Sequence, residues 1–193
     1  MPRPKDPDGP RAAMIDSAIS LIRRRGVAAV SFTDVLQASG APRGSVYHHF
    51  PGGRAQLITE ATEAASRRVT TGVTRALGAA QSSAALRALA DMLARGLDEN
   101  DYALGCPIAA AALGNEPGAV TAAGSAFDSL RELIAAKLVE DGARPERARS
   151  IALLVISALE GALIVARTER GPAALDTVVE ELSEICRIAV EEK

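Results

Sequence analysis

Apolar residues along this chain recur every three or four positions over long segments, the spacing that places them on one face of an α-helix. In residues 9–25 the repeating positions are Met14, Ala18, Leu21 and Ile22, and Gly26 ends the segment. Alternation typical of β-strands does not stand out anywhere. The pattern predicts an all-α protein of about nine helices. Their expected ranges are 9–25, two short helices within 31–50, 54–77, a helix for which Ser82 and Ser83 offer an N-cap, 107–114, 118–140, 146–170 and 174–192.

The last two predicted helices carry a surplus of apolar residues. The helix that ends near residue 170 is apolar on two faces, one of which includes Leu154 and Ala158. A helix that is apolar on two faces must be covered on both. The final helix has one clean stripe, which includes Leu182, Ile185 and Cys186. We expect these five residues to lie at an interface with another protein chain.

Residues 31–54, SFTDVLQASGAPRGSVYHHFPGGR, predict two short helices joined by a tight turn. Ser31 and Asp34 have the spacing of a capping box, which opens a helix. Gly40 ends that helix, because glycine accepts the left-handed conformation of a helix C-terminus, and Pro42 suits the start of the next helix. This arrangement is typical of a helix-turn-helix, whose second helix enters the major groove of DNA.

The same segment resembles the N-terminal signature of the tetracycline-repressor (TetR) family of transcriptional regulators. The matching features are the apolar pair after Asp34, the Ala38-x-Gly40 turn, and Gly44, Ser45, Tyr47 and Phe50. Two features differ from the usual pattern. Pro42 replaces a serine, and the stretch from Pro51 to Arg54 is one residue longer, which is similar to the lincomycin-resistance-repressor-like subgroup.

The resemblance implies two domains and a homodimer. We expect a helix-turn-helix DNA-binding domain over residues 1–53, with a flexible arm over residues 1–9. Residues 54–193 would then form a larger helical domain for effector binding and dimerisation. The family dimerises through its last two long helices, packed as a four-helix bundle, so the resemblance identifies the expected partner as a second copy of this chain.

Residues in and beside the motif are predicted to contact double-stranded DNA. Arg43 can pair with guanine, and Ser45, Tyr47 and His48 can reach phosphates or base edges. Alternatively, Tyr47 packs within the small domain and the other side chains are solvated. The complete predicted set is Thr33, Arg43, Gly44, Ser45, Tyr47, His48 and Arg54. We expect no metal site, because adjacent histidines on a helix point about 100° apart and chelate poorly.

Charge is distributed unevenly along the 193 residues. The formal net charge is −2, yet residues 1–54 contain eight Lys and Arg against four Asp and Glu, whereas the other 139 contain fourteen against twenty. A basic end on an acidic body is expected of a DNA-binding protein. Two cysteines do not make a disulfide framework, no signal peptide is visible, and the longest uncharged run, 14 residues, is too short to cross a bilayer. We expect a cytoplasmic protein.

An effector pocket is predicted in the second domain. Small residues crowd positions 109–124, where they either let helices pack closely or leave room for a ligand; the resemblance favours a ligand. Glu160 lies inside an apolar stripe, so its carboxylate needs a partner, which is Arg167, a basic group of a second subunit, or the effector. Cys106 is either a small apolar residue or a redox-sensitive thiol. The predicted lining is Tyr102, Cys106, Ala109, Ala123, Phe127 and Glu160.

These observations predict a transcriptional regulator without a cofactor. Specifically, we expect a homodimeric repressor that binds a pseudo-palindromic operator and is released by a small, largely apolar effector. No recognisable catalytic motif is present, so we do not expect an enzyme. Two alternatives remain open: a helical enzyme or small-molecule carrier that uses the cavity of the second domain, and an architectural DNA-binding protein without an effector.

Overall fold

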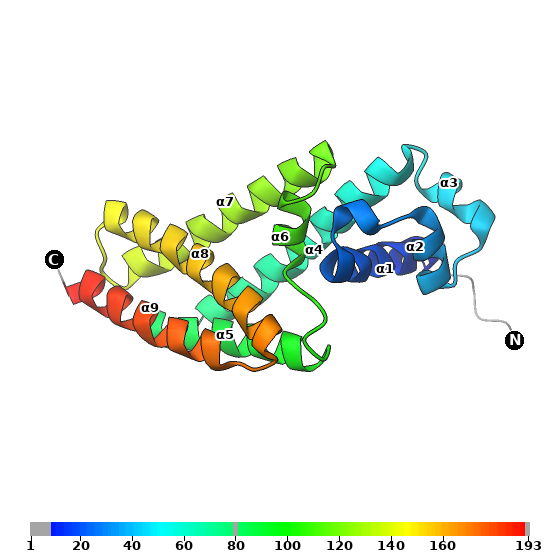
Figure 1. The fold of residues 1–193 in the computed structure, drawn as a ribbon. Helices are drawn as coiled ribbons and strands as arrows, with labels where there is room; N and C mark the ends of the chain where they lie inside the picture. Colours follow the sequence, from blue (N-terminus) through cyan, green and yellow to red (C-terminus); the bar gives the residue numbers. More distant parts are fainter. Residues whose placement is uncertain (1–8, 79–80, 192–193) are drawn as a thin grey trace, which may run out of the picture. The chain divides into compact units, whose positions relative to one another are not determined.

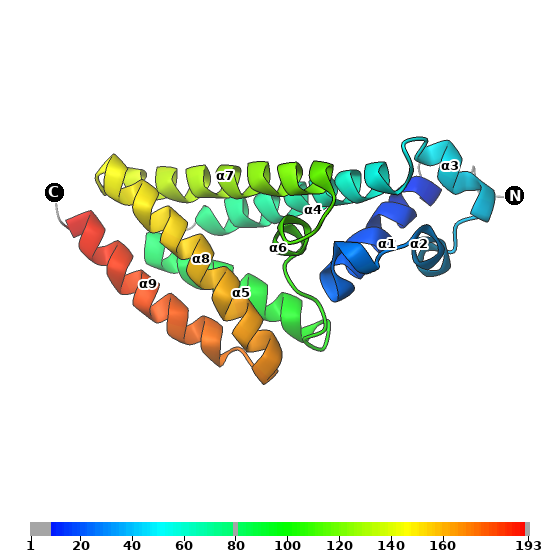
Figure 2. The ribbon, with the colours of Figure 1, turned by 45° about the horizontal axis from the view of Figure 1, so that its top comes forward.

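The predicted all-α class is confirmed. The computed structural model describes residues 9–78 and 81–191, and within these ranges it contains nine α-helices, two 3₁₀ turns and no strand (Figure 1, Figure 2). The helices are α1 (Gly9–Arg25), α2 (Phe32–Ser39), α3 (Val46–His49), α4 (Gly53–Leu77), α5 (Ser82–Asp98), α6 (Pro107–Ala112), α7 (Pro117–Glu140), α8 (Pro145–Glu169) and α9 (Ala173–Glu191), and the 3₁₀ turns are η1 (Val27–Ala29) and η2 (Arg43–Ser45). Residues 1–8 of the predicted arm lie outside the described residues, and Gly9 begins α1.

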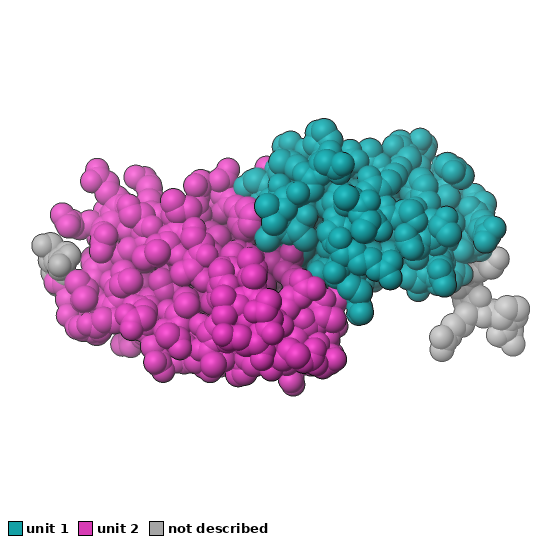
Figure 3. All heavy atoms as spheres, viewed as in Figure 1, with its two compact units in different colours: residues 1–66, 107–124 teal, residues 67–106, 125–193 magenta. Residues whose placement is uncertain are grey.

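The chain divides into two compact units, each assembled from two segments (Figure 3). Unit 1 comprises residues 1–66 and 107–124, and unit 2 comprises residues 67–106 and 125–193. Helices α4 and α7 therefore each contribute residues to both units. The domain boundary expected after residue 53 falls at the start of α4 and remains a prediction about how the chain folds.

The core of unit 1 follows from the stripe that predicted α1. Met14, Ala18 and Ile22 are spaced by four residues, so they lie on one side of α1, and all three are buried. Helix α1 packs against α2 and against α6. Val46 in α3 and Phe50 directly after it are also buried. These apolar side chains hold the short helix α3, which four residues of local hydrogen bonding would not stabilise alone.

In unit 2, the apolar stripe of α9 faces the interior of the same protomer. Helix α9 packs against both α5 and α8. Leu182 and Cys186, predicted to lie at a dimer interface, are each only 2% exposed in the single chain. Burial, with a smaller effect of the Asp141 carboxylate, raises the pKa of the Cys186 thiol to about 11, so the thiol is neutral. These two residues are core residues of the protomer, and their assignment to its surface is corrected.

Helix α8 has one buried and one exposed apolar face. Its buried stripe includes Ile151, Val155 and Leu159. On the other side, the exposed fraction ranges from 42% for Val165 to 63% for Ile164, and Leu153 and Leu154 fall between these values. By length and composition α8 is also apolar enough to cross a membrane, although a core helix passes the same test. The exposed face lacks a cover within the described part of the protomer.

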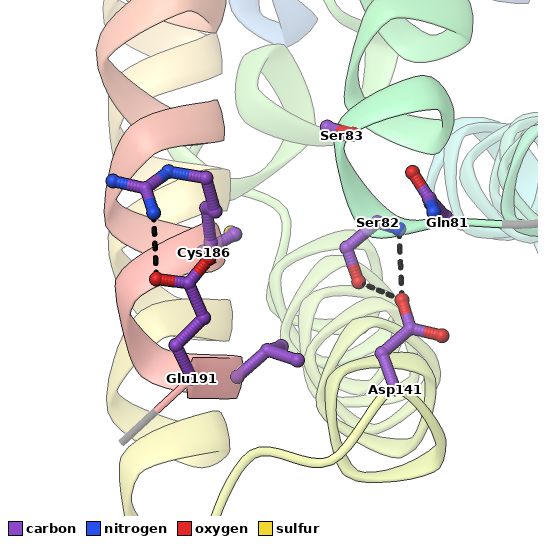
Figure 4. A pocket seen from close by; sticks show the side chains of 8 residues that line it. Gln81, Ser82, Ser83, Asp141, Cys186 and Glu191 are labelled. Carbon is purple, nitrogen blue, oxygen red and sulfur yellow. Dashed lines mark hydrogen bonds and ion pairs between the residues drawn. The ribbon is translucent and has the colours of Figure 1, made fainter.

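The N-terminus of α5 is capped from a distant part of the chain. The predicted cap by Ser82 and Ser83 is wrong: α5 begins at Ser82, and Gln81 before it makes no capping bond with its side chain. Instead, a carboxylate oxygen of Asp141, in the α7–α8 turn, accepts a hydrogen bond from the Ser82 backbone N–H at 2.8 Å and another from the Ser82 hydroxyl (Figure 4). The other Asp141 oxygen lies 2.8 Å from Nζ of Lys137.

A pocket of about 260 Å³ lies beside this cap (Figure 4). Its polar lining is largely paired within the protein. The Arg187 guanidinium lies 2.6 Å from the Glu191 carboxylate, and Ser82 is bonded to Asp141. None of the residues predicted to line an effector pocket lines this one.

Candidate nucleic-acid interface

The helix-turn-helix is built as the local sequence predicted. The Asp34 backbone N–H donates to the Ser31 hydroxyl oxygen at 3.1 Å, and the Ser31 backbone N–H donates to the Asp34 carboxylate at 3.2 Å. This confirms the capping box at the start of α2. Gly40 follows α2 with φ of 67°, the left-handed conformation that favours glycine. Pro42 precedes η2 in an extended conformation, so the chain turns before α3.

Beyond the turn, η2 and α3 place Val46 in the core and leave most of their other side chains at the surface. Val46 is 1% exposed, whereas the neighbouring Tyr47 is 69% exposed. Arg43 and His48 are exposed as well. The Tyr47 side chain is therefore mostly exposed rather than buried in the core. The surface formed by η2 and α3 presents a guanidinium, a phenol and an imidazole, all of which can donate hydrogen bonds to DNA.

The Tyr47 ring is held in place by a residue that the sequence did not single out. Phe32, the first residue of α2, makes an edge-to-face contact with Tyr47, with the ring centroids 5.8 Å apart and the planes at 71°. Such aromatic pairs are weakly attractive beyond the area that they bury. Thr33, the next residue of α2, is exposed. No signal in the sequence marked Phe32, because its partner is fifteen positions away, in a different helix.

Two other predicted residues are already engaged within unit 1. The Ser45 hydroxyl donates to the Pro42 carbonyl at 2.7 Å, which leaves its oxygen available as an acceptor. Arg54 points its guanidinium at the carbonyls of Val27 and Val30 and at the Glu116 carboxylate. Gly44, by contrast, is exposed, with open space around the position of a Cβ atom.

The helix-turn-helix carries a negative charge, that of Asp34, in the first turn of α2. Hydrogen bonds from the Ser31 side chain and backbone lower the pKa of Asp34, and the Arg25 guanidinium, 3.7 Å away, lowers it further. Asp34 is therefore a stable anion in this otherwise basic region, and it neutralises part of the cluster Arg23–Arg25 at the end of α1.

Comparison with known proteins decides the family. Residues 14–61 match the model of the tetR family of bacterial regulatory proteins, and residues 82–181 match the C-terminal domain of the LmrA/YxaF-like transcriptional regulators. The chain belongs to the TetR family. The predicted resemblance, including its lincomycin-resistance-repressor-like subgroup, is confirmed. This TetR-family chain is a DNA-binding transcriptional regulator, not an enzyme.

Individual relatives extend over nearly the whole TetR chain. The HTH-type transcriptional regulator Rv0196 of Mycobacterium tuberculosis (strain H37Rv) is 42% identical over 182 residues, which cover 90% of this chain and 92% of that protein. The HTH-type transcriptional regulator LmrA of Bacillus subtilis (strain 168) is 25% identical, over 86% of this chain and 90% of that protein. Among solved structures, a TetR-family regulator from Agrobacterium tumefaciens superposes with a TM-score of 0.80 at 21% identity, covering 93% of this chain and 98% of that chain, and shows the same fold.

The residues predicted to line an effector pocket are divided between the two units. Ala109 and Ala123 belong to unit 1, and the other four, Tyr102, Cys106, Phe127 and Glu160, belong to unit 2. Burial raises the pKa of Glu160, and a hydrogen bond from the Cys106 thiol opposes this shift. The structure thus brings Cys106 and Glu160 together.

Arg167 has different partners from the one predicted for it. It donates to the backbone carbonyls of Tyr102 and Ala103, at 3.3 and 3.0 Å. The Arg170 guanidinium lies 5.8 Å from the centre of the Tyr102 ring. Arg167 in α8 and Arg170, which directly follows α8, therefore both contact the segment between α5 and α6. The hydrogen-bond partner that lowers the pKa of Glu160 is Cys106.

Proposed function

We propose that this TetR-family protein is a homodimeric repressor whose η2–α3 surface reads a pseudo-palindromic operator and whose unit 2 binds a small effector that releases the DNA. One observation supports the DNA-binding part of this proposal. Arg43 in η2 and Tyr47 and His48 in α3 are exposed, while Val46 and Phe50 anchor the same segment in the core. The reading surface is thereby both accessible and rigidly supported.

Each exposed residue receives a distinct role in this proposal. Arg43 pairs with a guanine edge, which a guanidinium does in a bidentate manner. Tyr47 donates its hydroxyl to a phosphate, with its ring held by Phe32. Ser45, His48 and Thr33 contribute further phosphate or base contacts, and Gly44 lets the backbone approach the DNA.

Dimerisation is proposed to occur through the exposed apolar face of α8. Leu153, Leu154, Ile164 and Val165 are between 42% and 63% exposed in the single chain, which is costly for four large apolar side chains on one helix. A second copy of α8 would cover them. Ala158 in α8 and Ile185 in α9 are both partly exposed, and we propose that they also contribute to the interface. An obligate interface of this kind buries upwards of about 2,000 Å².

Glu160 and Cys106 are the residues that support an effector site in unit 2. Burial disfavours the charged form of the Glu160 carboxyl group, which accepts a hydrogen bond from the Cys106 thiol, so the group favours a ligand that supplies a further donor. Tyr102 and Phe127, both half-buried, would line the apolar remainder. The proposed effector is therefore largely apolar and carries one hydrogen-bond donor.

Selection of bound fragments from genomic DNA tests the proposal. The wild-type dimer should enrich an inverted repeat whose half-sites are about 34–36 Å apart, or a multiple of that distance. Arg43→Ala should weaken binding to that duplex by about 1–3 kcal/mol and relax the preference at one base pair. The matched control is Arg131→Ala, which removes an exposed arginine that pairs with Asp128 in unit 2. Enrichment of no sequence by the wild type, or equal losses in both variants, would refute the proposal.

A further inference from the structure

The guanidinium group of Arg54 connects three segments of unit 1. Its Nε donates to the Val30 carbonyl at 2.6 Å, its Nη2 donates to the Val27 carbonyl, and its Nη1 lies 3.4 Å from the Glu116 carboxylate. The Arg54 and Glu116 side chains are only 33% and 19% exposed. Arg54 lies in the first turn of α4, Val27 begins η1, Val30 directly follows η1, and Glu116 immediately precedes α7. The Arg54 side chain therefore joins α4 to the η1 segment and to the residue before α7 through hydrogen bonds and an ion pair.

Two glycines bring the α6–α7 corner, defined as residues 107–124, into close contact with the same region. A Cβ atom on Gly114 would lie 2.8 Å from Cβ of Val27. A Cβ atom on Gly118, in the first turn of α7, would lie 2.4 Å from Oγ1 of Thr59 in α4. Both separations are shorter than van der Waals contact, so only glycine fits without movement. The corner is packed tightly against the helix-turn-helix end of unit 1.

From this junction a continuous series of contacts leads to the DNA-reading surface. Val30, which accepts from Arg54, directly precedes Ser31, the capping residue of α2. Phe32 then begins α2 and holds the Tyr47 ring. A displacement of Val30 would therefore change where α2 starts and where Tyr47 points. A misplacement of about 1 Å is enough to weaken a precisely oriented contact.

We propose that Arg54 and Glu116 are positioning residues for operator binding, and that the α6–α7 corner is a working part of the DNA-binding unit. This inference rests on the proposed function, since it concerns the same reading surface. It replaces the DNA contact first expected of Arg54. The two roles predict opposite effects of neutralising Glu116. If Arg54 bound phosphate, the Glu116 carboxylate would compete with the phosphate for the Arg54 guanidinium and would repel DNA. Removal of the Glu116 charge would then strengthen operator binding.

Charge variants test the pair on the duplex that the wild-type protein selects. Glu116→Gln and Arg54→Gln should each weaken binding about 3- to 30-fold, the range of effects within one hydrogen-bonded network. The double variant should be no weaker than Arg54→Gln alone, because both changes break the same connection. The control Asp128→Asn removes one negative charge that also has an arginine partner, Arg131, and should leave binding unchanged. Tighter binding by Glu116→Gln, or additive losses, would overturn the proposal.

The salt dependence of the same variants separates positioning from direct contact. Removal of a phosphate contact lowers the slope of log K against log salt by about 1 for each lost contact, and a dimer would lose two. Arg54→Gln should keep the wild-type slope while its affinity falls. A reduced slope would assign Arg54 to the phosphate backbone and end the positioning role.

A steric variant with a built-in rescue tests the corner without changing any charge. Gly118→Ala should weaken operator binding, because its methyl group overlaps the Thr59 side chain. Thr59→Ala removes the overlapping atoms, so the double variant should regain most of the affinity. Each variant is first checked for wild-type helicity and dimer size, so that loss of fold is not read as loss of positioning. If Gly118→Ala bound the operator as tightly as the wild type, or if the double variant did not regain affinity, the α6–α7 corner would have no role in operator binding.

Hydrogen exchange without DNA distinguishes a failure of the positioning role from a failure of the proposed function. The Val30 amide donates to Val27 and the Val35 amide donates to Ser31, so both are protected while this segment is fixed. Glu116→Gln and Gly118→Ala should speed exchange at these two amides, and Asp128→Asn should not. If the wild type selects no duplex, the proposed function fails, and this exchange measurement still decides the positioning role. Unchanged exchange in both variants would reject that role.

Discussion

Asp141→Ala is expected to destabilise unit 2 by removing the cap of α5. Asp141 accepts the Ser82 backbone N–H at 2.8 Å and pairs with Lys137 at 2.8 Å, and its side chain is only 14% exposed (Figure 4). Loss of a capping oxygen costs about 0.5–2 kcal/mol. Lys137, which is 9% exposed, also loses its nearer carboxylate and keeps only Glu140 at 3.8 Å, which adds to the destabilisation.

Urea denaturation at fixed protein concentration measures this change. An effect of about 1–2 kcal/mol corresponds to a fall of about 2–8 °C in Tm for a chain of this size. Asp141→Asn keeps an oxygen acceptor for Ser82, so it should be less destabilising than Asp141→Ala. Asp128→Ala, at an exposed pair with Arg131, is the control and should match the wild type.

The pH dependence of the stability difference between the wild type and Asp141→Ala provides a second test of the capping argument. Burial raises the pKa of Asp141, but hydrogen bonds from Lys137 and Ser82 outweigh it and lower the pKa overall. The contribution of Asp141 is therefore complete above the unfolded pKa of about 4 and is lost as the pH falls through the lower folded value. Wild type and Asp141→Ala should differ constantly from pH 5 to 8 and converge in more acidic solution. Equal stability at neutral pH would refute the capping argument.

Three further outcomes follow from burial and local hydrogen bonding. Ile164→Glu, on the exposed face of α8, should yield folded monomers in sedimentation, whereas Leu182→Glu, at a site 2% exposed, should unfold the protomer; a dimeric Ile164→Glu would contradict the proposed interface. Because burial raises the pKa of Glu160, the wild type should lose stability relative to Glu160→Gln as pH rises above about 4, and parallel urea midpoints would argue against this. Ser31→Ala should cost about 0.5–2 kcal/mol in thermal unfolding, and no change would mean that the capping box is dispensable.

Local sequence was sufficient for the features that depend on a few consecutive residues. The capping box of Ser31 and Asp34, the left-handed Gly40 and the helix ranges follow from short-range sterics and hydrogen bonds, and all were predicted. The motif also identified the family, since its residue types recur at fixed spacing. The roles proposed for Arg43 and Tyr47 also follow from their residue types and positions in the motif, and the structure adds that both side chains are exposed.

Features that depend on distant segments were missed for one physical reason. Periodicity tells which face of a helix is apolar but not which element covers it. The stripe of α9 containing Leu182 and Cys186 therefore suggested a partner chain, although α5 and α8 cover it within the protomer. Likewise, Asp141 caps a helix that begins 59 residues earlier, and Arg54 reaches Glu116 across 62 residues. No local pattern records such a pairing.

The count of basic residues along the sequence also overestimates the positive charge that unit 1 can present to DNA. Arg11, Arg25 and Arg54 lie beside the carboxylates of Glu60, Asp34 and Glu116, respectively, and each of these six residues belongs to unit 1. An arginine paired in this way releases fewer counterions on binding than an exposed one, so it adds less to salt-dependent affinity. Arg43 is exposed on the η2–α3 surface, which also presents Tyr47. Operator recognition should accordingly depend more on the geometry of α2 and α3 than on the net charge of the N-terminal region, which is why an internal arginine that fixes the start of α2 can matter as much as one that touches DNA.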